Sequence, residues 1–463
     1  MGSNISWRAR PLFGAVAAAL VTLSTGAALA QPAPQTPAQP APSQEDRALS
    51  ERIDKLEQTL RALEEASRKR EAEVAALLKG VGTLQAAEAA RGAAEAALAA
   101  ESKKPSLSLT VNGAVELYYQ WSFNDPDNGI TNFRGFDNRH NSFTVPNVML
   151  DVRGAYEGAE ARVALQVGHA PSTYTLAEPA LAGSGAANAS SGELWKYVQQ
   201  AYVGYEAPVG GGLLVQGGIF LSPIGPESLV IKDSWSWSRS NLFFGLPFYH
   251  AGLRATYKAS PEWSVTLAGY NGWNDIVDNN DEKSLSLQLS HASKELSWSL
   301  LYFGGVERPT DAPEGRAWRH TFDTYATWTA TSWLALQPHL DGGFEPNEFG
   351  ASGWVAGALS ARFTFTDWLF GVVRQDAFYE VAAEDSTGTA GRIFWPAEWV
   401  ASSTATLEAR AVDHVLLRLE VRHDHAEGDM FFRGAVRGDG VTTPFVPNTS
   451  TQDTLTLGAT AWF

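Results

Sequence analysis

The stretch LSLTVNGAVEL (107–117) decides the fold, because its apolar and polar residues alternate with a period of two. Every second side chain of a β-strand points to the same face of the sheet, so this stretch has one apolar face and one polar face. The stretch AEARVALQV (159–167) repeats the pattern, with Val163 and Leu165 on one face and Arg162 on the other. Such strands are typical of soluble β-sandwiches and of membrane barrels, whose apolar face meets lipid.

The connections between these segments distinguish the two architectures. Sixteen candidate strands begin near Leu107, Val145, Ala159, Tyr197, Leu213, His250, Glu262, Ser284, Glu295, Arg319, Trp333, Trp354, Trp368, Trp399, His414 and Gln452. Short turns alternate with long loops, which we place at 124–140, 169–195, 221–248, 271–283, 304–318, 344–350, 379–398 and 426–451. Bacterial outer-membrane barrels join their strands in this way, with short periplasmic turns and long external loops. We therefore predict an all-β transmembrane protein, an antiparallel barrel of about 16 strands over residues 106–463.

The final segment supports the same fold. Leu455, Leu457, Ala459, Ala461 and Phe463 share one face, an arrangement similar to the C-terminal signal read when outer-membrane proteins are inserted. We expect the barrel assembly machinery and outer-membrane lipid to be partners. Tryptophans near strand ends suit the aromatic girdles of a membrane protein: Trp121, Trp263, Trp298, Trp333, Trp368 and Trp399.

The N-terminus predicts export. Arg8 and Arg10 precede an apolar run (12–23), and Ala28-Leu29-Ala30 fits a cleavage site. Residues 1–30 are therefore predicted to be a signal peptide, since about twelve apolar residues are too few to span a bilayer. Residues 31–44 form a Pro/Ala-rich linker, which we expect to be extended.

Residues 45–101 have a heptad-like pattern that predicts an α-helical coiled coil. The apolar seam consists of Leu49, Ile53, Leu56, Leu60, Leu63, Val74, Leu77, Val81, Leu84 and Leu98. Polar residues interrupt it at Ser67, Arg70, Glu88, Arg91 and Glu95. Two interpretations are open: a periplasmic stalk that makes a homotrimer or contacts the cell wall, and a lone solvated helix.

Composition excludes several classes of function. The chain has no cysteine, which excludes disulfides and thiolate metal sites. Its formal net charge is −16, nearly all of it in the barrel segment, and this argues against nucleic acid as a partner.

The polar face of the strands supplies the candidate functional residues. Strand parity and the aromatic-rich loop 221–248 give the predicted pore-lining set: Arg153, Arg162, Lys232, Arg239, Arg254, Arg319, Arg362, Arg374, Asp376, Glu408, Arg410, Arg418, Glu420 and Arg422. One interpretation is a pore wall whose charges set ion selectivity. The other is a ladder of ion pairs that neutralise one another. Surplus acid in the loops favours a slight preference for cations.

Loop 221–248 is the most distinctive connection. It combines Lys232 and Arg239 with several large aromatic residues. The loop either folds into the lumen and narrows it, with both cations at the constriction, or it caps the barrel or contacts another copy.

Other chemistry is weakly indicated. Oxygen-bearing residues at 275–281 have the ligand type of a Ca²⁺ site without the spacing of an EF-hand. His423 and His425 fall on the opposite strand face from Asp424, which argues against a shared site. No triad or phosphate-binding loop is recognisable, so we predict neither an enzyme nor a cofactor nor a bound metal.

Three stretches that follow one another resemble the OmpL-like β-barrel porin family: GGIFLSPIGPE (217–227), SRSNLFFGLPFYHAGLRATY (238–257) and GYNGWNDIVDNNDEKS (269–284). ELYYQWSFNDPDN (116–128), FRGFDNRHNSF (133–143) and QQAYVGYE (199–206) resemble the first third of the same family. The resemblance implies an outer-membrane channel and says little about the solute. We expect a porin for small hydrophilic solutes or ions, with the coiled coil in the periplasm. The alternative is a structural protein that tethers the membrane to the cell wall.

Overall fold

The computed structural model describes residues 49–80 without 50, 53, 56, 63, 64 and 78, residue 91, and residues 107–463 without 176, 177 and 179–190. The chain divides into two compact units, Met1–Ser102 and Lys103–Phe463. The predicted signal peptide (1–30), the linker (31–44) and much of the coiled-coil seam lie outside the described residues.

In the first unit, residues 57–62 and 65–77 are helical. Leu60, Val74 and Leu77 of the predicted seam are exposed on this helix. Among the described helices of the chain, none combines the length and the apolar character needed to span a bilayer.

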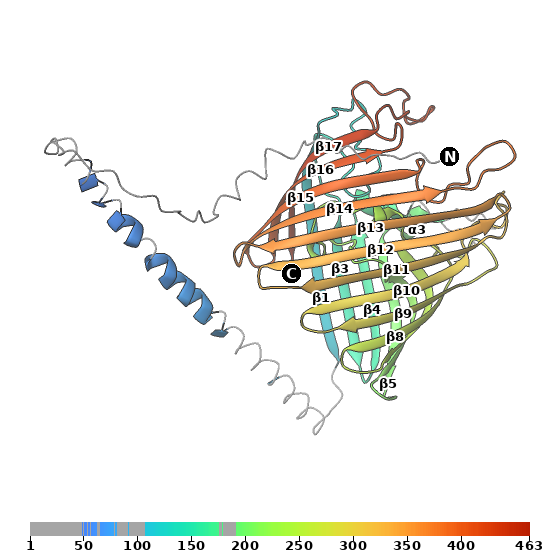
Figure 1. Cartoon of the computed structure of the whole chain (residues 1–463). Coiled ribbons are helices and arrows are strands. Elements are labelled where there is room, and N and C mark those ends of the chain that lie inside the picture. Colours follow the sequence, from blue (N-terminus) through green and yellow to red (C-terminus); the bar gives the residue numbers. More distant parts are fainter. Residues whose placement is uncertain are drawn as a thin grey trace, which may run out of the picture. The chain divides into compact units, whose positions relative to one another are not determined.

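The second unit is a β-barrel, and most of its strands are labelled in Figure 1. They are β1 (Ser108–Ser122), β2 (Ser142–Thr144), β3 (Val148–Tyr156), β4 (Ala159–Val167), β5 (Val198–Ala207), β6 (Leu213–Leu221), β7 (Tyr249–Lys258), β8 (Trp263–Tyr270), β9 (Ser284–Ala292), β10 (Leu296–Val306), β11 (Trp318–Thr329), β12 (Leu334–Asn347), β13 (Gly350–Thr364), β14 (Leu369–Val381), β15 (Trp399–Val412), β16 (Val415–Ala426) and β17 (Thr451–Trp462). Short helices lie in the connections: α2 (His169–Tyr174), α3 (Gly192–Trp195), η3 (Ile231–Asp233) and α4 (Asn241–Phe244).

The barrel is closed by the first and last strands. β1 pairs antiparallel with β17, from Ala114 opposite Trp462 to Ser122 opposite Thr454. Its other edge pairs with β3 and then with the short β2, so these two strands together occupy one place in the wall. The result is a closed antiparallel barrel of 16 strands, as predicted.

Connections at the two ends of the barrel differ. At one end, which we call the turn end, β3 reaches β4 through Glu157 and Gly158, whose φ values of 48° and 84° define a tight hairpin turn. Long loops lie at the other end, the loop end. The loop expected at 344–350 is the exception: β12 continues to Asn347 and β13 starts at Gly350, so only two residues connect them.

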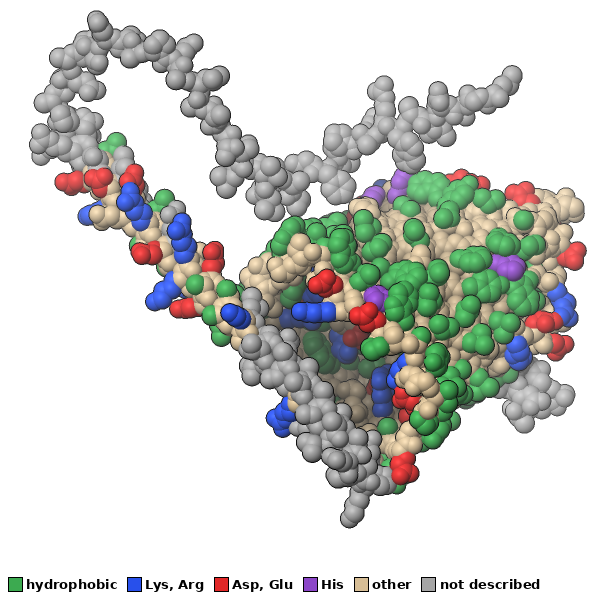
Figure 2. Space-filling view, turned by 60° about the horizontal axis from the view of Figure 1, so that its bottom comes forward, with side chains coloured by type: hydrophobic (Ala, Val, Ile, Leu, Met, Phe, Trp, Pro, Cys, Tyr) green, Lys and Arg blue, Asp and Glu red, His purple; other side chains and the backbone are tan. Residues whose placement is uncertain are grey.

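The wall is apolar outside and charged inside. On β16, Leu417, Leu419 and Val421 are about half exposed, whereas Arg418 and Glu420 between them are each 1% exposed. Figure 2 shows hydrophobic side chains over the outer surface and charged side chains within a hollow of the barrel. Because a soluble protein buries its apolar face instead, this inversion is the arrangement expected in lipid.

The strands differ in length around the barrel. β3–β9 contain between 8 and 10 residues each. β12–β15 contain between 13 and 15 residues each. The wall is therefore longer on one side than on the other.

Candidate functional site

Loop 221–248, which joins β6 to β7, lies inside the barrel. Its backbone contacts inward-facing side chains of β1, β14 and β16, which are far from it in sequence. Ile231 N donates to Glu116 on β1 at 2.6 Å, and Asn241 N donates to Asp376 on β14 at 2.9 Å. Of the two placements considered for this loop, the structure has the inward one.

Arg418 on β16 holds the loop through backbone carbonyl groups. Its guanidinium donates to Ile231 O at 2.9 Å and to Ser236 O at 3.0 Å, and also to Ser234 O. The same guanidinium donates to Glu408 on β15 at 2.8 Å. Five N–H donors in a planar fork suit such a cluster of acceptors, and the site is fully enclosed.

Glu420, two residues further along β16, holds the loop through backbone amides. Its carboxylate accepts hydrogen bonds from Trp237 N at 2.6 Å and from Ser238 N at 2.9 Å. Thr406 of β15 donates to the same carboxylate at 2.7 Å. Successive inward residues of one strand thus bind carbonyl groups and then amides of one loop, which fixes its register on the wall.

Arg239 is enclosed by its own loop. Its guanidinium donates to the carbonyl oxygens of Ser228 at 3.0 Å, Trp237 at 3.0 Å and Leu229 at 2.7 Å. It also lies 4.5 Å from the ring centroid of Phe136. Burial lowers the pKa of Arg239, although nearby carboxylates, Glu116 first, oppose the shift. Arg239 was predicted to line the pore, but it is buried within its own loop.

Loop 124–140, between β1 and β2, also packs inside the barrel. Arg134 forms an ion pair with Asp137 of the same loop and another with Asp424 of β16 at 3.2 Å. Burial favours the neutral form of Asp137, but the charge and hydrogen bond of Arg134 outweigh it and lower the pKa of this carboxyl. Two loops are therefore anchored to β16.

The predicted pore-lining residues fall into two groups. Those that keep some exposed surface are Arg153, Arg162, Lys232, Arg254, Arg362 and Arg410. Those that are buried between the wall and the loops are Arg239, Arg319, Arg374, Asp376, Glu408, Arg418, Glu420 and Arg422. Pairing is extensive in both groups: Glu408, for example, accepts from Arg362, Arg410 and Arg418.

His423 and His425 are exposed on the outer face, whereas Asp424 is buried inside. The opposite faces expected from strand parity are therefore observed. His423 instead lies 2.8 Å from Asp453 on the neighbouring strand β17.

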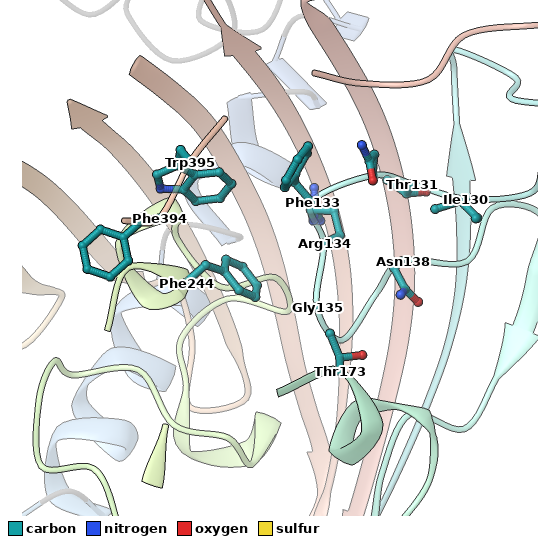
Figure 3. Close-up of a pocket in the computed structure, with 11 residues that line it drawn as sticks. Ile130, Thr131, Phe133, Arg134, Gly135, Asn138, Thr173, Phe244, Phe394 and Trp395 are labelled. Carbon is teal, nitrogen blue, oxygen red and sulfur yellow. The ribbon is translucent and has the colours of Figure 1, made fainter. Parts of the chain in front are cut away.

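Two cavities at the loop end were not predicted. The first, of about 270 Å³, is lined by Phe133, Phe244, Phe394 and Trp395, and we call it the aromatic cavity. Figure 3 shows these rings and Arg134 around the space. The second, of about 420 Å³, contains Asp275 and Glu307 in its wall, and we call it the acidic cavity. Phe244 and Phe394 line both cavities, so the two are neighbours. The adjacent aromatic residues Phe394 and Trp395 within a long loop were the feature of the sequence that could have indicated the aromatic cavity.

Lys232 provides a prediction about selectivity. Its side chain is 27% exposed and forms an ion pair with Asp233 at 2.7 Å. Replacing Lys232 by Glu reverses one charge, so we expect cation permeability relative to anion permeability to rise by about twofold at 0.1 M salt, where screening acts over ~10 Å. Reversal potentials in a salt gradient measure this ratio. A ratio that stays at the wild-type value in both dilute and concentrated salt would show that Lys232 does not face the permeation path.

The sequence of the barrel matches that of a known protein family. The family model described as "beta-barrel porin-2, OmpL-like" matches residues 108–463. No curated protein sequence matches the chain.

Solved structures similar in fold are outer-membrane proteins. The outer membrane channel DcaP of Acinetobacter baumannii has 11% sequence identity and a TM-score of 0.48, covering 77% of this chain and 97% of its own. An anion-selective porin from Comamonas acidovorans has 11% identity and a TM-score of 0.49, covering 77% and 100%. OmpT of Vibrio cholerae has 10% identity and a TM-score of 0.48, covering 78% and 99%. The family model spans all of the barrel's strands, and the chain therefore belongs to the OmpL-like β-barrel porin family.

Proposed function

We propose that the barrel is a channel through which small hydrophilic solutes or ions diffuse passively across the outer membrane. One observation carries this proposal: the inner wall keeps charged side chains in contact with solvent. The side chains of Arg153 and Arg410 are 52% and 37% exposed on the inward face. A packed core would exclude such charges, because burying an unpaired charge away from water is costly, so their exposure indicates water inside the barrel.

The loops support a narrowed channel. Loop 221–248 is fixed to the wall by ion pairs and backbone hydrogen bonds. An element held in this way restricts the lumen to solutes that pass beside it, and the surface left at the turn end is rich in arginine. This arrangement favours a selective channel over an enzyme.

Reconstitution tests the proposal. Heat-modifiable, folded protein placed in a planar lipid bilayer in KCl is expected to give stepwise increases in conductance, because a water-filled lumen with charged walls conducts small ions. Unfolded protein from the same preparation is the control. A folded barrel that inserts and gives no steps would contradict the channel.

The helical segment supports a further part of the proposal, a homotrimer with the coiled coil in the periplasm. Leu60, Val74 and Leu77 are exposed on the helix of a single chain, at positions that a heptad seam would cover with other copies. The alternative is a tether that reaches the cell wall through the same segment.

Deleting residues 31–104 separates these possibilities. We expect the truncated barrel to conduct in bilayers, while the fraction of trimer measured by sedimentation falls severalfold because the seam contacts are lost. Trimers that persist unchanged would contradict the role of the seam in assembly. Loss of envelope integrity with normal solute flux would favour the tether.

A further inference from the structure

The acidic cavity lies between loop 221–248 and the loops that follow β8, β10 and β14. Aromatic side chains from three of these loops line it: Phe248, Trp273 and Phe394. Asp275 and Glu307 contribute carboxylates to the same wall. A volume of about 420 Å³ is within the range of small-molecule sites, and the mixture of rings with a few polar groups is typical of them.

Asp275 is the unusual residue in this wall. Its side chain is buried, with 2% of the residue exposed. Within the part of the barrel that the structure describes, no group donates a hydrogen bond to its carboxylate and no cation pairs with it. Buried carboxylates are almost always paired or hydrogen-bonded, because an isolated one is strongly destabilised. An unpartnered carboxylate in a cavity wall points to a ligand.

The neighbouring cations are already committed elsewhere. Arg319 donates to Glu345 at 2.9 Å, and Arg308 donates to Glu345 at 2.6 Å and to Glu314 at 2.7 Å. Glu307 receives only neutral donors, Trp273 N at 2.7 Å and Ser284 Oγ at 2.6 Å. Among the described residues, no cation forms an ion pair with Asp275 or Glu307, although Arg319 lines the same cavity and its charge opposes the rise in the pKa of both carboxyls.

The backbone of Gly272 packs directly against both carboxylates. A Cβ atom added at Gly272 would lie 2.5 Å from Asp275 Oδ2 and 3.4 Å from Glu307 Oε2. Both oxygens therefore lie close to the same residue of the backbone, which brings the two carboxylates near each other in the cavity wall. A hydrogen-bond donor placed in the cavity can approach both.

The aromatic wall already lies against one positive charge of the protein. The guanidinium of Arg319 lies 5.2 Å from the ring centroid of Trp273 and 5.8 Å from that of Phe394. Cations at such distances are attracted by the electron-rich ring faces. An apolar group attached to a cation would find contacts on Phe248 and on the free parts of these rings.

We propose that the acidic cavity binds small organic cations, with the ammonium group between Asp275 and Glu307 and the hydrocarbon part against Phe248, Trp273 and Phe394. The described residues contain no group of three or more acidic or histidine side chains placed to hold a metal ion, which favours the organic ligand. Binding of the cation does not require conduction. Only the statement that the bound cation is a solute of the channel rests on the proposed function.

The protonation of Asp275 should make cation binding at this site depend on pH. Burial raises the pKa of Asp275 to about 9. The negative charges of Glu307, Glu178 and Asp278 add to this rise, whereas the positive charge of Arg319 opposes it. Below that pH the free site holds a proton, which the ammonium must displace. Affinity for the cation should therefore rise with pH between 6 and 9, by at most about tenfold per pH unit.

Calorimetry of the folded protein in detergent tests binding without requiring conduction. n-Butylammonium chloride is the probe and n-butanol is its neutral analogue. We expect saturable binding of the cation alone, weakened roughly ten- to a hundredfold in Asp275→Asn because a charge-assisted hydrogen bond is lost. Gly272→Ala should weaken it similarly, because the added methyl group would clash with Asp275 Oδ2 and displace that carboxylate.

Asp311→Asn is the matched control, since it removes an exposed acid from the neighbouring loop. Its affinity should equal that of the wild type. Equal binding by Asp275→Asn and wild type, equal binding of butanol, or tighter binding of CaCl₂ than of butylammonium would each overturn the proposal. Bilayer conductance in KCl without the probe tests the channel separately, so a silent barrel that binds the cation refutes only the channel.

Discussion

Replacing Arg418 by methionine is expected to detach loop 221–248 from the wall and to destabilise the barrel by about 3 kcal/mol. The guanidinium is 1% exposed and donates to three loop carbonyls as well as to Glu408. Methionine fills a similar volume but leaves these buried acceptors without donors, and removal of one member of a buried ionic network has this order of cost. A loop that leaves the lumen also widens it, so single-channel conductance should increase.

The midpoint of heat-induced unfolding on SDS gels measures the stability, and KCl conductance measures the lumen. Arg153→Met is the matched control, because Arg153 is half exposed and makes one hydrogen bond, of 3.4 Å, to Asp151. Its effect on stability should stay within about 0.5 kcal/mol. If the two variants shift the midpoint equally, Arg418 does not hold the loop.

Replacing Gly458 by valine is expected to displace the same loop by a different route. A Cβ atom on Gly458 would lie 2.1 Å from Cε3 of Trp237, so the indole ring rests directly on the β17 backbone. Trp237 is 1% exposed and has no free space into which it can retreat. Overpacking of this kind costs about 1–3 kcal/mol, and the strain falls on the contact between loop and wall.

Gly458→Val should cost much less stability in a Trp237→Ala background than in the wild type, because the truncated side chain makes room for valine. The four proteins of this double-mutant cycle give the coupling between the two positions. Gly154→Val controls for valine in a strand, since nothing lies within 4 Å of a Cβ atom at Gly154. Additive effects of the two substitutions would contradict the packing argument.

The strands were predictable from sequence because their signal is local. Alternation along each segment places Leu417 outside and Arg418 inside without reference to any other strand. Fourteen of the sixteen predicted strand starts lie within one residue of the observed ones, whereas β13 begins at Gly350 instead of Trp354 and Val145 falls between β2 and β3. The expected loop at 344–350 is wrong for a local reason too. Pro346, Asn347 and Gly350 read as turn residues, but pairs such as Pro346 with Ala351 continue the ladder to its tip.

The sequence allowed an inward position of loop 221–248 as one of two possibilities but could not decide between them. Its contacts join residues 187 positions apart, as between Arg418 and Ile231, and no periodicity in the sequence reports such a pairing. Two cations of this loop also end in different surroundings, since Lys232 keeps exposed surface and Arg239 is enclosed by carbonyls. The acidic cavity was out of reach for the same reason, because its wall is assembled from separate loops.

The unequal strand lengths bear on how the protein fits its membrane. Eight to ten residues, at ~3.3 Å each and a tilt of about 40°, give a height of roughly 20–25 Å, close to the ~25 Å apolar band of outer-membrane barrels. The 13 to 15 residues of β12–β15 give roughly 33–38 Å by the same reasoning. The tall side must project beyond the hydrocarbon, while the short side matches or falls below its thickness. Hydrophobic mismatch is thus confined to one side of the circumference.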